Sequence, residues 1–290
     1  MRMPHTFAVA VRRPDGEIAI TEDVLLRPQE KFRWLGYPVL RGLAVLVQSV
    51  AVGMRALRFS AEQALEGMPG ERGKKKTEFR GWMLWLNVAF SLAFFIFFYK
   101  FVPLYLATLV KRNYDWAGNL VIFNLLDGLI RLALFVSLLW LLAQWKEIQR
   151  LFEYHGAEHK VVWAFEQGDP VDVSTARVCS RFHPRCGTSF MLVVLFIALV
   201  VYLFLPFESF LAKFVSRLLL LPLIAGVSYE FIRLAAKTRG KLWRVAARPG
   251  LWLQRITTRE PDDSQLETAI RALKTAMQGE RSRGGELVIA

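Results

Sequence analysis

The sequence predicts a mainly α-helical integral membrane protein with about four transmembrane helices, an interfacial amphipathic helix, a small N-terminal β-hairpin and cytoplasmic helical segments. Of its 290 residues, 54% are hydrophobic and 22% are charged. The apolar residues must therefore lie in long runs rather than in one soluble core. Basic residues gather beside the ends of those runs, as the positive-inside rule describes for membrane proteins.

Four apolar runs are long enough to cross a bilayer, which takes about 20 helical residues. They cover residues 81–99 continuing through 101–110, 118–145, 188–207 and 211–232. Lys213 and Arg217 lie near the start of the fourth run, and their long stems are expected to snorkel toward the headgroups. The second run is expected to continue as one helix past Trp145 through Phe165 and to end near Gly168.

The N-terminal region, residues 1–33, is expected to form a cytoplasmic β-hairpin. Two short strand-like segments flank a turn formed by residues 14–16, Pro-Asp-Gly. Residues 34–62 are expected to form an amphipathic helix, because they are largely apolar but carry a polar stripe at intervals of seven: Arg41, Gln48, Arg55 and Glu62. Too few apolar residues lie between the arginines for a spanning helix, so this helix is expected at the interface or against the bundle.

The rest of the chain divides by composition into a basic linker, two pairs of transmembrane helices and two cytoplasmic segments. Their ranges are 63–80 for the linker, 81–145 for helices 1 and 2, 146–187 for a His/Cys segment, 188–232 for helices 3 and 4, and 233–290 for the C-terminal region. Within the last, Ser264 to Glu267 has the form of a helix capping box. An apolar stripe follows at helical spacing and is expected to be a packing face: Leu266, Ala269, Ile270, Leu273 and Met277.

Basic residues place both termini in the cytoplasm, because lysines and arginines of residues 72–80 precede the first apolar run and others follow the last at 233–248. Lys213 and Arg217 count weakly against this orientation. The formal charge of +13 suits contact with anionic lipid headgroups, which are the expected partners. Nucleic acid is not expected as a partner, since the charges flank the spans and form no patch interleaved with aromatic side chains.

Two short motifs of the polar segment 146–187, residues 155–159 and 183–186, contain three of the four histidines and one of the two cysteines. His155, Glu158 and His159 stand at i, i+3 and i+4 of an expected helix, so two imidazoles and a carboxylate share one face. The order His-x-x-Glu-His is that of the reversed zincins, in which the histidines bind zinc and the glutamate activates a water. His183 and Cys186 can then complete the ligand set for zinc or another divalent transition metal.

Several alternatives remain open at this segment. Four ligands would make a closed structural site, whereas three ligands and a water would make a catalytic one. Without a metal, the histidines can be interfacial residues bonded to glutamates or backbone, with His183 capping a turn. Glu158 can serve only to orient an imidazole. Cys179 can replace Cys186, although its expected place in a short helix disfavours this.

Two readings of the cysteines are not expected. A disulfide framework is disfavoured because cytoplasmic thiols stay reduced. A cysteine phosphatase is excluded because the loop after Cys186 lacks the arginine that such a site needs.

Three charged residues lie within or near the apolar runs, where charge is costly and is by default functional or paired. Asp127 and Arg131 stand at i, i+4, so a structural ion pair on one helix face is expected over a conduction or substrate role. Glu230 lies near the end of the fourth run. It can be a late carboxylate ligand or the partner of a basic residue.

Four motifs carry a resemblance to known sequences. They are His155 to Lys160, Ser180 to Phe190, Ser228 to Glu230, and Pro249 to Gln254 with the following Thr257-Thr258 and Glu260-Pro261. In these motifs, and nearly end to end, the chain resembles the YqhQ-like family of bacterial membrane proteins. The resemblance implies a multi-pass protein of the bacterial cytoplasmic (inner) membrane and a domain of unknown function, often labelled a predicted metal-dependent enzyme.

The chain departs from the family pattern at its beginning. Members usually open with a glycine-rich segment of which only Met1-Arg2 can correspond here. The chain is therefore expected either to start at an internal methionine or to lack a strand partner for residues 7–11.

Two functions from different classes follow from these observations. The first is a zinc-dependent membrane enzyme, a hydrolase acting on a membrane-proximal or lipid-linked substrate at the cytoplasmic face. In it His155, His159 and His183 bind the metal, Cys186 is a fourth ligand or lies beside the site, and Glu158 activates water. The second is a non-enzymatic homo-oligomer that organises, deforms or moves lipid, with the cluster as a structural metal site. Solute transport through Asp127 and Arg131 has less support.

Overall fold

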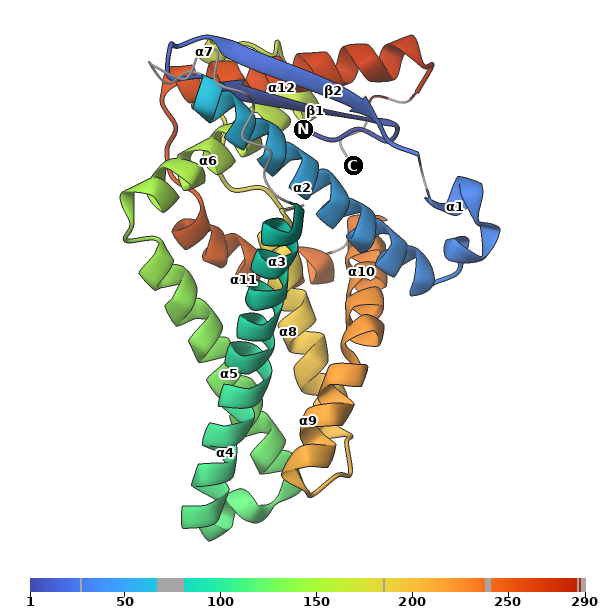
Figure 1. The fold of residues 1–290 in the computed structure, drawn as a ribbon, viewed down its shortest axis with the longest axis vertical. Coiled ribbons are helices and arrows are strands. Elements are labelled where there is room, and N and C mark those ends of the chain that lie inside the picture. The colour runs from blue at the N-terminus through green and yellow to red at the C-terminus, as the bar shows by residue number, and fades with distance from the viewer. Residues whose placement is uncertain (27, 67–80, 185, 238–240, 286, 288–290) are drawn as a thin grey trace. The chain divides into compact units, whose positions relative to one another are not determined.

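Figure 1 shows the fold in a computed structural model that describes residues 1–26, 28–66, 81–184, 186–237, 241–285 and 287. Helices make up 75% of the structure, and the two strands form one antiparallel sheet. The chain divides into two compact units. Residues 1–73, 143–189 and 240–290 form the first, here called the sheet unit. Residues 74–142 and 190–239 form the second, here called the apolar unit. The expected 63–80 linker falls largely outside the described residues.

The sheet unit begins with the expected hairpin. Strand β1 (Thr6–Arg12) pairs with β2 (Ile18–Val24), and Thr6 lies opposite Val24 in the register. The helices of this unit are α1 (Pro28–Lys31), a 3-10 turn η1 (Arg33–Gly36), α2 (Leu40–Glu66), α6 (Lys146–Gln167), α7 (Val173–Val178), α11 (Lys241–Thr257) and α12 (Asp263–Ser282). A lone hairpin is only marginally stable, and here α12 lies along β1 (Figure 1).

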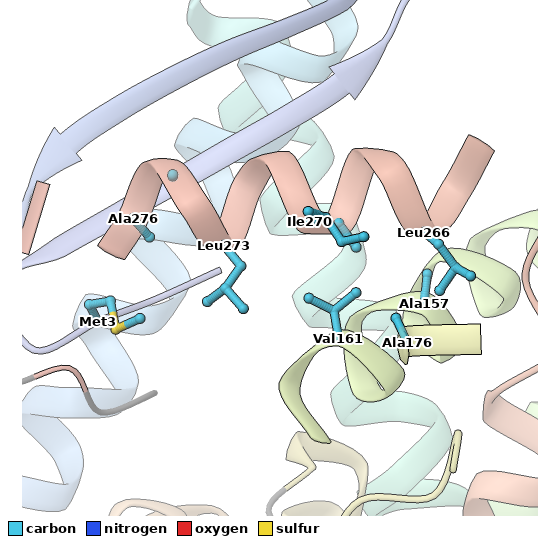
Figure 2. Packing of buried hydrophobic residues seen from close by; sticks show 10 residues of the cluster. Met3, Ala157, Val161, Ala176, Leu266, Ile270, Leu273 and Ala276 are labelled. Carbon is cyan, nitrogen blue, oxygen red and sulfur yellow. The ribbon is translucent and has the colours of Figure 1, made fainter. Parts of the chain in front are cut away.

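The core of the sheet unit is the expected apolar stripe of α12. Leu266, Ile270 and Leu273 are buried and point toward Ala157 and Val161 of α6, as Figure 2 shows. Burying each large aliphatic side chain stabilises the fold by about 1.5–3 kcal/mol. The C-terminal helix therefore fixes the hairpin and α6 in one body.

The capping box of α12 lies two residues earlier than the sequence suggested. Asp262 accepts a hydrogen bond from the backbone N–H of Gln265 at 2.9 Å, and the Gln265 side chain accepts one from the backbone N–H of Asp262 at 2.9 Å. Ser264 instead donates to the Asp262 carboxylate at 2.7 Å. The expectation that Ser264 and Glu267 form the box was wrong, because a carboxylate already occupies the cap position.

Helix α2 has its polar stripe directed toward the hairpin region. Gln48 accepts a hydrogen bond from Arg2 at 2.7 Å, and Arg55 lies 3.5 Å from Asp23 of β2. Residues 40–64 are nevertheless long and apolar enough to cross a membrane by length and composition. The expectation that this helix has too few apolar residues to span was wrong by that measure.

The apolar unit contains the remaining helices. They are α3 (Gly81–Ile96), a π-helical segment η2 (Phe97–Phe101), α4 (Val102–Asn113), a 3-10 turn η3 (Asp115–Gly118), α5 (Leu120–Leu142), α8 (Gly187–Leu203, whose first turn lies in the sheet unit), α9 (Phe210–Leu219) and α10 (Leu221–Lys237). Among the described residues, three helices could span a membrane by length and composition: 40–64, 89–113 and 120–142. Counting the bent pair α9 and α10 as one span gives four.

Three expectations about these helices need correction. The third run forms a helix of only 17 residues, α8, because the chain leaves helical geometry after Leu203. The fourth run is broken after Leu219, where α9 and α10 meet at 48°; Pro222 of α10 has no N–H to donate to the preceding turn. Lys213 and Arg217 do not snorkel but are 3% and 1% exposed, since Lys213 lies over the ring of Phe123 and Arg217 contacts Asp127 and Asn124.

The second run does not continue into α6 as one helix. Helix α5 ends at Leu142, Trp145 is extended, and α6 begins at Lys146. The amide of Gln149 donates to the carbonyls of Ala143 and Gln144, both at 3.1 Å. These side-chain bonds satisfy the carbonyls left free at the break. The far end is as expected, since α6 stops at Gly168 with φ 78°, a left-handed cap that glycine accommodates.

Candidate metal centre

Two histidines of α6 meet a cysteine that immediately precedes α8. His155 and His159 are one helical turn apart, and their ring centroids are 4.4 Å from each other. The Nε2 atom of His155 lies 3.1 Å from the Sγ atom of Cys186. Among the described residues, these three form a group whose ligand atoms all lie within 4.8 Å of one another. His159 and Cys186 are buried, and His155 is half-buried.

Backbone carbonyls fix the tautomers of both imidazoles. The Nδ1 atom of His155 donates to the carbonyl of Thr257 at 2.7 Å, and that of His159 donates to the carbonyl of Arg181 at 2.6 Å. A carbonyl can only accept, so each Nδ1 carries its proton and the Nε2 atoms face the cluster. Metal-binding histidines are oriented in this way by the partner of the other ring nitrogen.

The thiol of Cys186 is held in its ionised form. Burial alone would raise its pKa, but hydrogen bonds with His155 and His159, the charge of His155 and a hydrogen bond with Thr188 lower that pKa to about 5. The backbone N–H of Thr188, at the start of α8, also donates to Sγ at 3.4 Å. A helix N-terminus stabilises a thiolate in the same direction.

The pKa of His155 is raised in turn. Burial lowers it, but the hydrogen bond and the charge of Cys186, the carbonyl of Thr257 and the charge of Glu158 more than offset burial. The Nε2 atom of His155 and the sulfur of Cys186 therefore share a single proton. A divalent ion can replace that proton and be bound by all three lone pairs.

The donor set fits a transition metal. A thiolate with two imidazoles is a recognised ligand set of zinc, and around a tetrahedral zinc ion such donors lie about 3.3–3.6 Å apart, given bond lengths of about 2.0–2.3 Å. The 3.1 Å between Nε2 of His155 and Sγ of Cys186 needs only a small adjustment to reach that spacing. Three protein ligands leave the fourth position of a tetrahedron open.

Gly156 lets the segment after α11 lie against α6 beside the site. A Cβ atom at this position would overlap the carbonyl oxygen of Arg259. The backbone N–H of Arg259 donates to the carbonyl of Phe152 at 2.9 Å. The carbonyl of Thr257, two residues before Arg259, accepts from His155, so we expect that a side chain at the second residue of the His-Gly-Ala-Glu-His motif would disturb the orientation of the first.

Side chains of α6 also hold the loop that carries Cys186. Lys160 donates to the carbonyls of Arg177 and Cys179, both at 2.9 Å, and Trp163 donates to the carbonyl of Phe182 at 2.7 Å. With the bond from His159 to Arg181, four backbone carbonyls between residues 177 and 182 accept hydrogen bonds from side chains of α6. Lys160 and Trp163 were not singled out from the sequence as site residues, although Lys160 stands inside the first motif.

His183 lies beside the group rather than within it. Its ring centroid is 5.8 Å from that of His159, and its Nε2 atom is 3.3 Å from the carboxylate of Glu166. The buried side chain of Gln254 binds the backbone of His183 through two hydrogen bonds. Gln254 accepts from the N–H of His183 at 2.8 Å and donates to the carbonyl of His183 at 2.7 Å. Gln254 belongs to the fourth motif and His183 to the second. An expectation that these two motifs contact each other in the fold could have identified Gln254 as a site residue.

The remaining expected site residues lie elsewhere. Glu158 is half-exposed, outside the group of three, and its carboxylate is 3.9 Å from the N-terminal amine. The thiol of Cys179 donates a hydrogen bond to the carbonyl of Thr175 at 3.4 Å, and this residue caps α7. Burial raises the pKa of its thiol. Glu230 lies in α10, which belongs to the apolar unit.

The expected ion pair of α5 is present in the apolar unit. Arg131 and Asp127 lie 2.7 Å apart and are both buried. Arg217 of α9 also lies 2.8 Å from the other oxygen of Asp127, which the sequence pattern did not reveal.

Comparisons with known proteins agree with the motifs. Residues 37–279 match the model of a family described as "Protein of unknown function (DUF1385)". The chain is 32% identical over 287 residues to "Uncharacterized protein YqhQ" of Bacillus subtilis (strain 168), a match that covers 94% of this chain and 87% of that protein. No solved structure matches the chain.

Proposed function

We propose a function for this chain, which belongs to the YqhQ-like family of DUF1385 proteins. In this proposal it is a zinc-dependent membrane enzyme whose metal is bound by His155, His159 and Cys186. The observation that carries the proposal is the convergence of two correctly oriented imidazoles and a thiolate within 4.8 Å. Of the four ligands expected from the sequence, His155, His159, His183 and Cys186, this set leaves out His183. His183, bonded to Glu166, serves instead to position the Cys186 loop.

Hydrolysis is the reaction that such a site supports best. Zinc with three protein ligands lowers the pKa of a bound water to about 7 and so supplies hydroxide at neutral pH. Glu158 remains the proposed general base, since it stands on α6, three residues after His155 and next to His159. The proposed substrate is membrane-proximal or lipid-linked, and the proposed location is the cytoplasmic face of the bacterial inner membrane, with both termini on that side.

A structural metal site is the second candidate, and the burial of the group favours it. His159 is 5% and Cys186 9% exposed, as in closed sites that hold segments together. A metal here would tie α6 to the start of α8. In this case the protein would be a homo-oligomer that organises, deforms or moves lipid, as proposed from its amphipathic helices.

The metal content of the full-length protein in detergent, measured by mass spectrometry, tests whether the protein binds zinc through these ligands. We expect about one zinc per chain in the wild type and in Cys179→Ala, the matched cysteine control. We expect loss of zinc in His159→Ala and in Cys186→Ala. A wild type without metal after reconstitution with zinc, or equal zinc in all four proteins, would contradict the proposal.

A second experiment separates the two candidate functions. Cobalt replaces zinc and reports its coordination through its visible spectrum, and an added azide ion changes that spectrum only where a coordination position is open. The enzyme predicts an azide-dependent change, which His183→Ala does not abolish. A closed four-ligand site predicts none. In that case the structural function replaces the catalytic one.

A further inference from the structure

The apolar unit buries four basic side chains around one carboxylate. Lys100 of η2, Arg131 of α5, and Lys213 and Arg217 of α9 are between 1% and 5% exposed, and Asp127 of α5 is 0% exposed. Charges inside an apolar unit are strongly unfavourable unless they are paired or functional. This group, here called the cation cluster, therefore requires an explanation.

Pairing within the described residues does not neutralise the cation cluster. Arg131 and Arg217 both contact Asp127, at 2.7 Å and 2.8 Å, on different carboxylate oxygens. Arginine stays protonated in proteins, so two guanidinium groups against one carboxylate leave a positive charge even if both lysines are neutral. With both lysines charged, the excess grows further.

The cluster also holds buried hydrogen-bond donors that the described residues leave without an acceptor. Asn124 accepts from Nη2 of Arg217 at 2.9 Å, but the Nδ2 atom of Asn124 and the Nε atom of Arg217 are buried and have no hydrogen-bond partner among the described residues. Buried polar atoms are nearly always bonded, and each exception calls for a cause such as a ligand. The Nη1 atom of Arg217 and the Oδ1 atom of Asp127 also lack hydrogen-bond geometry, although they lie 2.8 Å apart as an ion pair. Outside that ion pair, the atoms of the cluster without a partner are donors, so the cluster lacks acceptors as well as negative charge.

Tyr202 of α8 lies at the centre of three of these cations. Lys100, Arg131 and Arg217 lie 5.3 Å, 5.1 Å and 5.0 Å from its ring centroid, and Lys100 donates to its hydroxyl at 2.9 Å. Contact with the ring attracts cations but supplies no compensating charge. The tyrosine therefore gathers the basic side chains without neutralising them.

Two helix irregularities bring the cations together. Lys100 lies in the π-helical segment η2, and Arg217 lies three residues before Leu220, where α9 and α10 meet at 48°. Within membranes, π-helical segments and broken helices are common at ligand sites. A change of the angle between α9 and α10 would move Arg217, which offers a way for a ligand to enter and leave.

We propose that the cation cluster binds an anion through a phosphate group. A guanidinium fork matches the oxygens of phosphate, and lysine adds a point charge. A phosphate brings both the negative charge and the several acceptors that Asn124 and Arg217 lack. Two sources offer this chemistry, a phospholipid headgroup and free inorganic phosphate.

The test uses the full-length protein in phosphatidylcholine nanodiscs, with two probes. Inorganic phosphate is titrated by calorimetry, and phosphatidic acid, added to the nanodiscs, is followed by native mass spectrometry. Arg217→Gln is expected to weaken binding by about tenfold or more, and Asp127→Asn, which removes the competing carboxylate, to tighten it by about tenfold. The exposed Arg112 supplies the control Arg112→Gln, which is expected to leave binding unchanged.

The opposite signs distinguish a binding site from a structural ion pair. Both Arg217→Gln and Asp127→Asn break a contact of the same network, so a structural role predicts that both only lower the unfolding temperature. Binding of phosphatidic acid alone assigns the lipid headgroup, and binding of inorganic phosphate assigns the free ion. Failure of both probes to bind the wild type, or affinities that are equal in Asp127→Asn and wild type, overturns the proposal.

Discussion

Replacement of Gly156 by alanine should weaken the metal centre without touching any ligand. The new Cβ atom would lie far closer to the carbonyl oxygen of Arg259 than the 3.0 Å below which real Cβ atoms are essentially never found. The backbone at Arg259 must therefore withdraw by about 1 Å or more to reach ordinary contact. That shift breaks the hydrogen bond from Arg259 to Phe152 and pulls Thr257 away from His155.

The magnitude follows from these contacts. Overpacking costs about 1–3 kcal/mol, and each of the two lost hydrogen bonds about 1 kcal/mol. The greater helix propensity of alanine returns up to about 1 kcal/mol. The net loss is expected to be about 2–5 kcal/mol in the stability of the sheet unit. Zinc affinity is expected to fall about 10–100-fold, as when the partner of a ligand histidine is lost.

Competition with a chelator gives the zinc affinity, and thermal unfolding in detergent gives the stability. Gly53→Ala is the matched control, because Gly53 lies inside α2 and a Cβ there meets nothing within 4 Å. It should leave zinc affinity unchanged and raise stability slightly. If Gly156→Ala binds zinc as tightly as the wild type and unfolds no earlier, the close approach of the two segments is not what orients His155.

Further predictions concern the thiols, the loop and the core. In metal-free protein, alkylation of Cys186 should rise with pH around a midpoint of about 5, since the thiolate forms above its lowered pKa. The pKa of Cys179 is raised, so this thiol should react only at alkaline pH. Bound zinc should protect Cys186 from alkylation. Because zinc displaces the proton shared with His155, zinc affinity should fall as the pH drops toward 5, and an affinity independent of pH would exclude this ligand set. Lys160→Met keeps the apolar stem but removes two hydrogen bonds from an ammonium group, and should lower stability by about 2–4 kcal/mol, measured by thermal unfolding. Leu273→Ala should cost about 3 kcal/mol by the same measurement; an unchanged unfolding temperature would show that α12 does not hold the sheet unit together.

The sequence was most informative where chemistry depends on residues close together in the chain. His155 and His159 share a helix face because of the helical period, and the apolar stripe of α12 is visible for the same reason. The hairpin was also predicted, since its turn residues lie between two strand-like segments. The family assignment from four motifs was confirmed.

Contacts between residues far apart in the sequence could not be predicted in this way. Which of His183 and Cys186 would approach α6 depends on Gln254, Trp163 and Lys160, which hold the loop from distant positions. The ends of the apolar helices were missed where side-chain bonds compete with the helix, as Gln149 does after α5. Arg217 was expected at the headgroups because no local pattern shows its partner Asp127, 90 positions earlier in the sequence.

X-ray absorption at the zinc edge, recorded on the full-length protein reconstituted with zinc, tests the metal centre most directly. Ligation by Cys186, His155 and His159 predicts one sulfur at about 2.3 Å and nitrogen or oxygen ligands at about 2.0–2.1 Å. The sulfur contribution should vanish in Cys186→Ser and persist in Cys179→Ser. A first shell without sulfur in the wild type, or one that is unchanged in Cys186→Ser, would contradict the site proposed here.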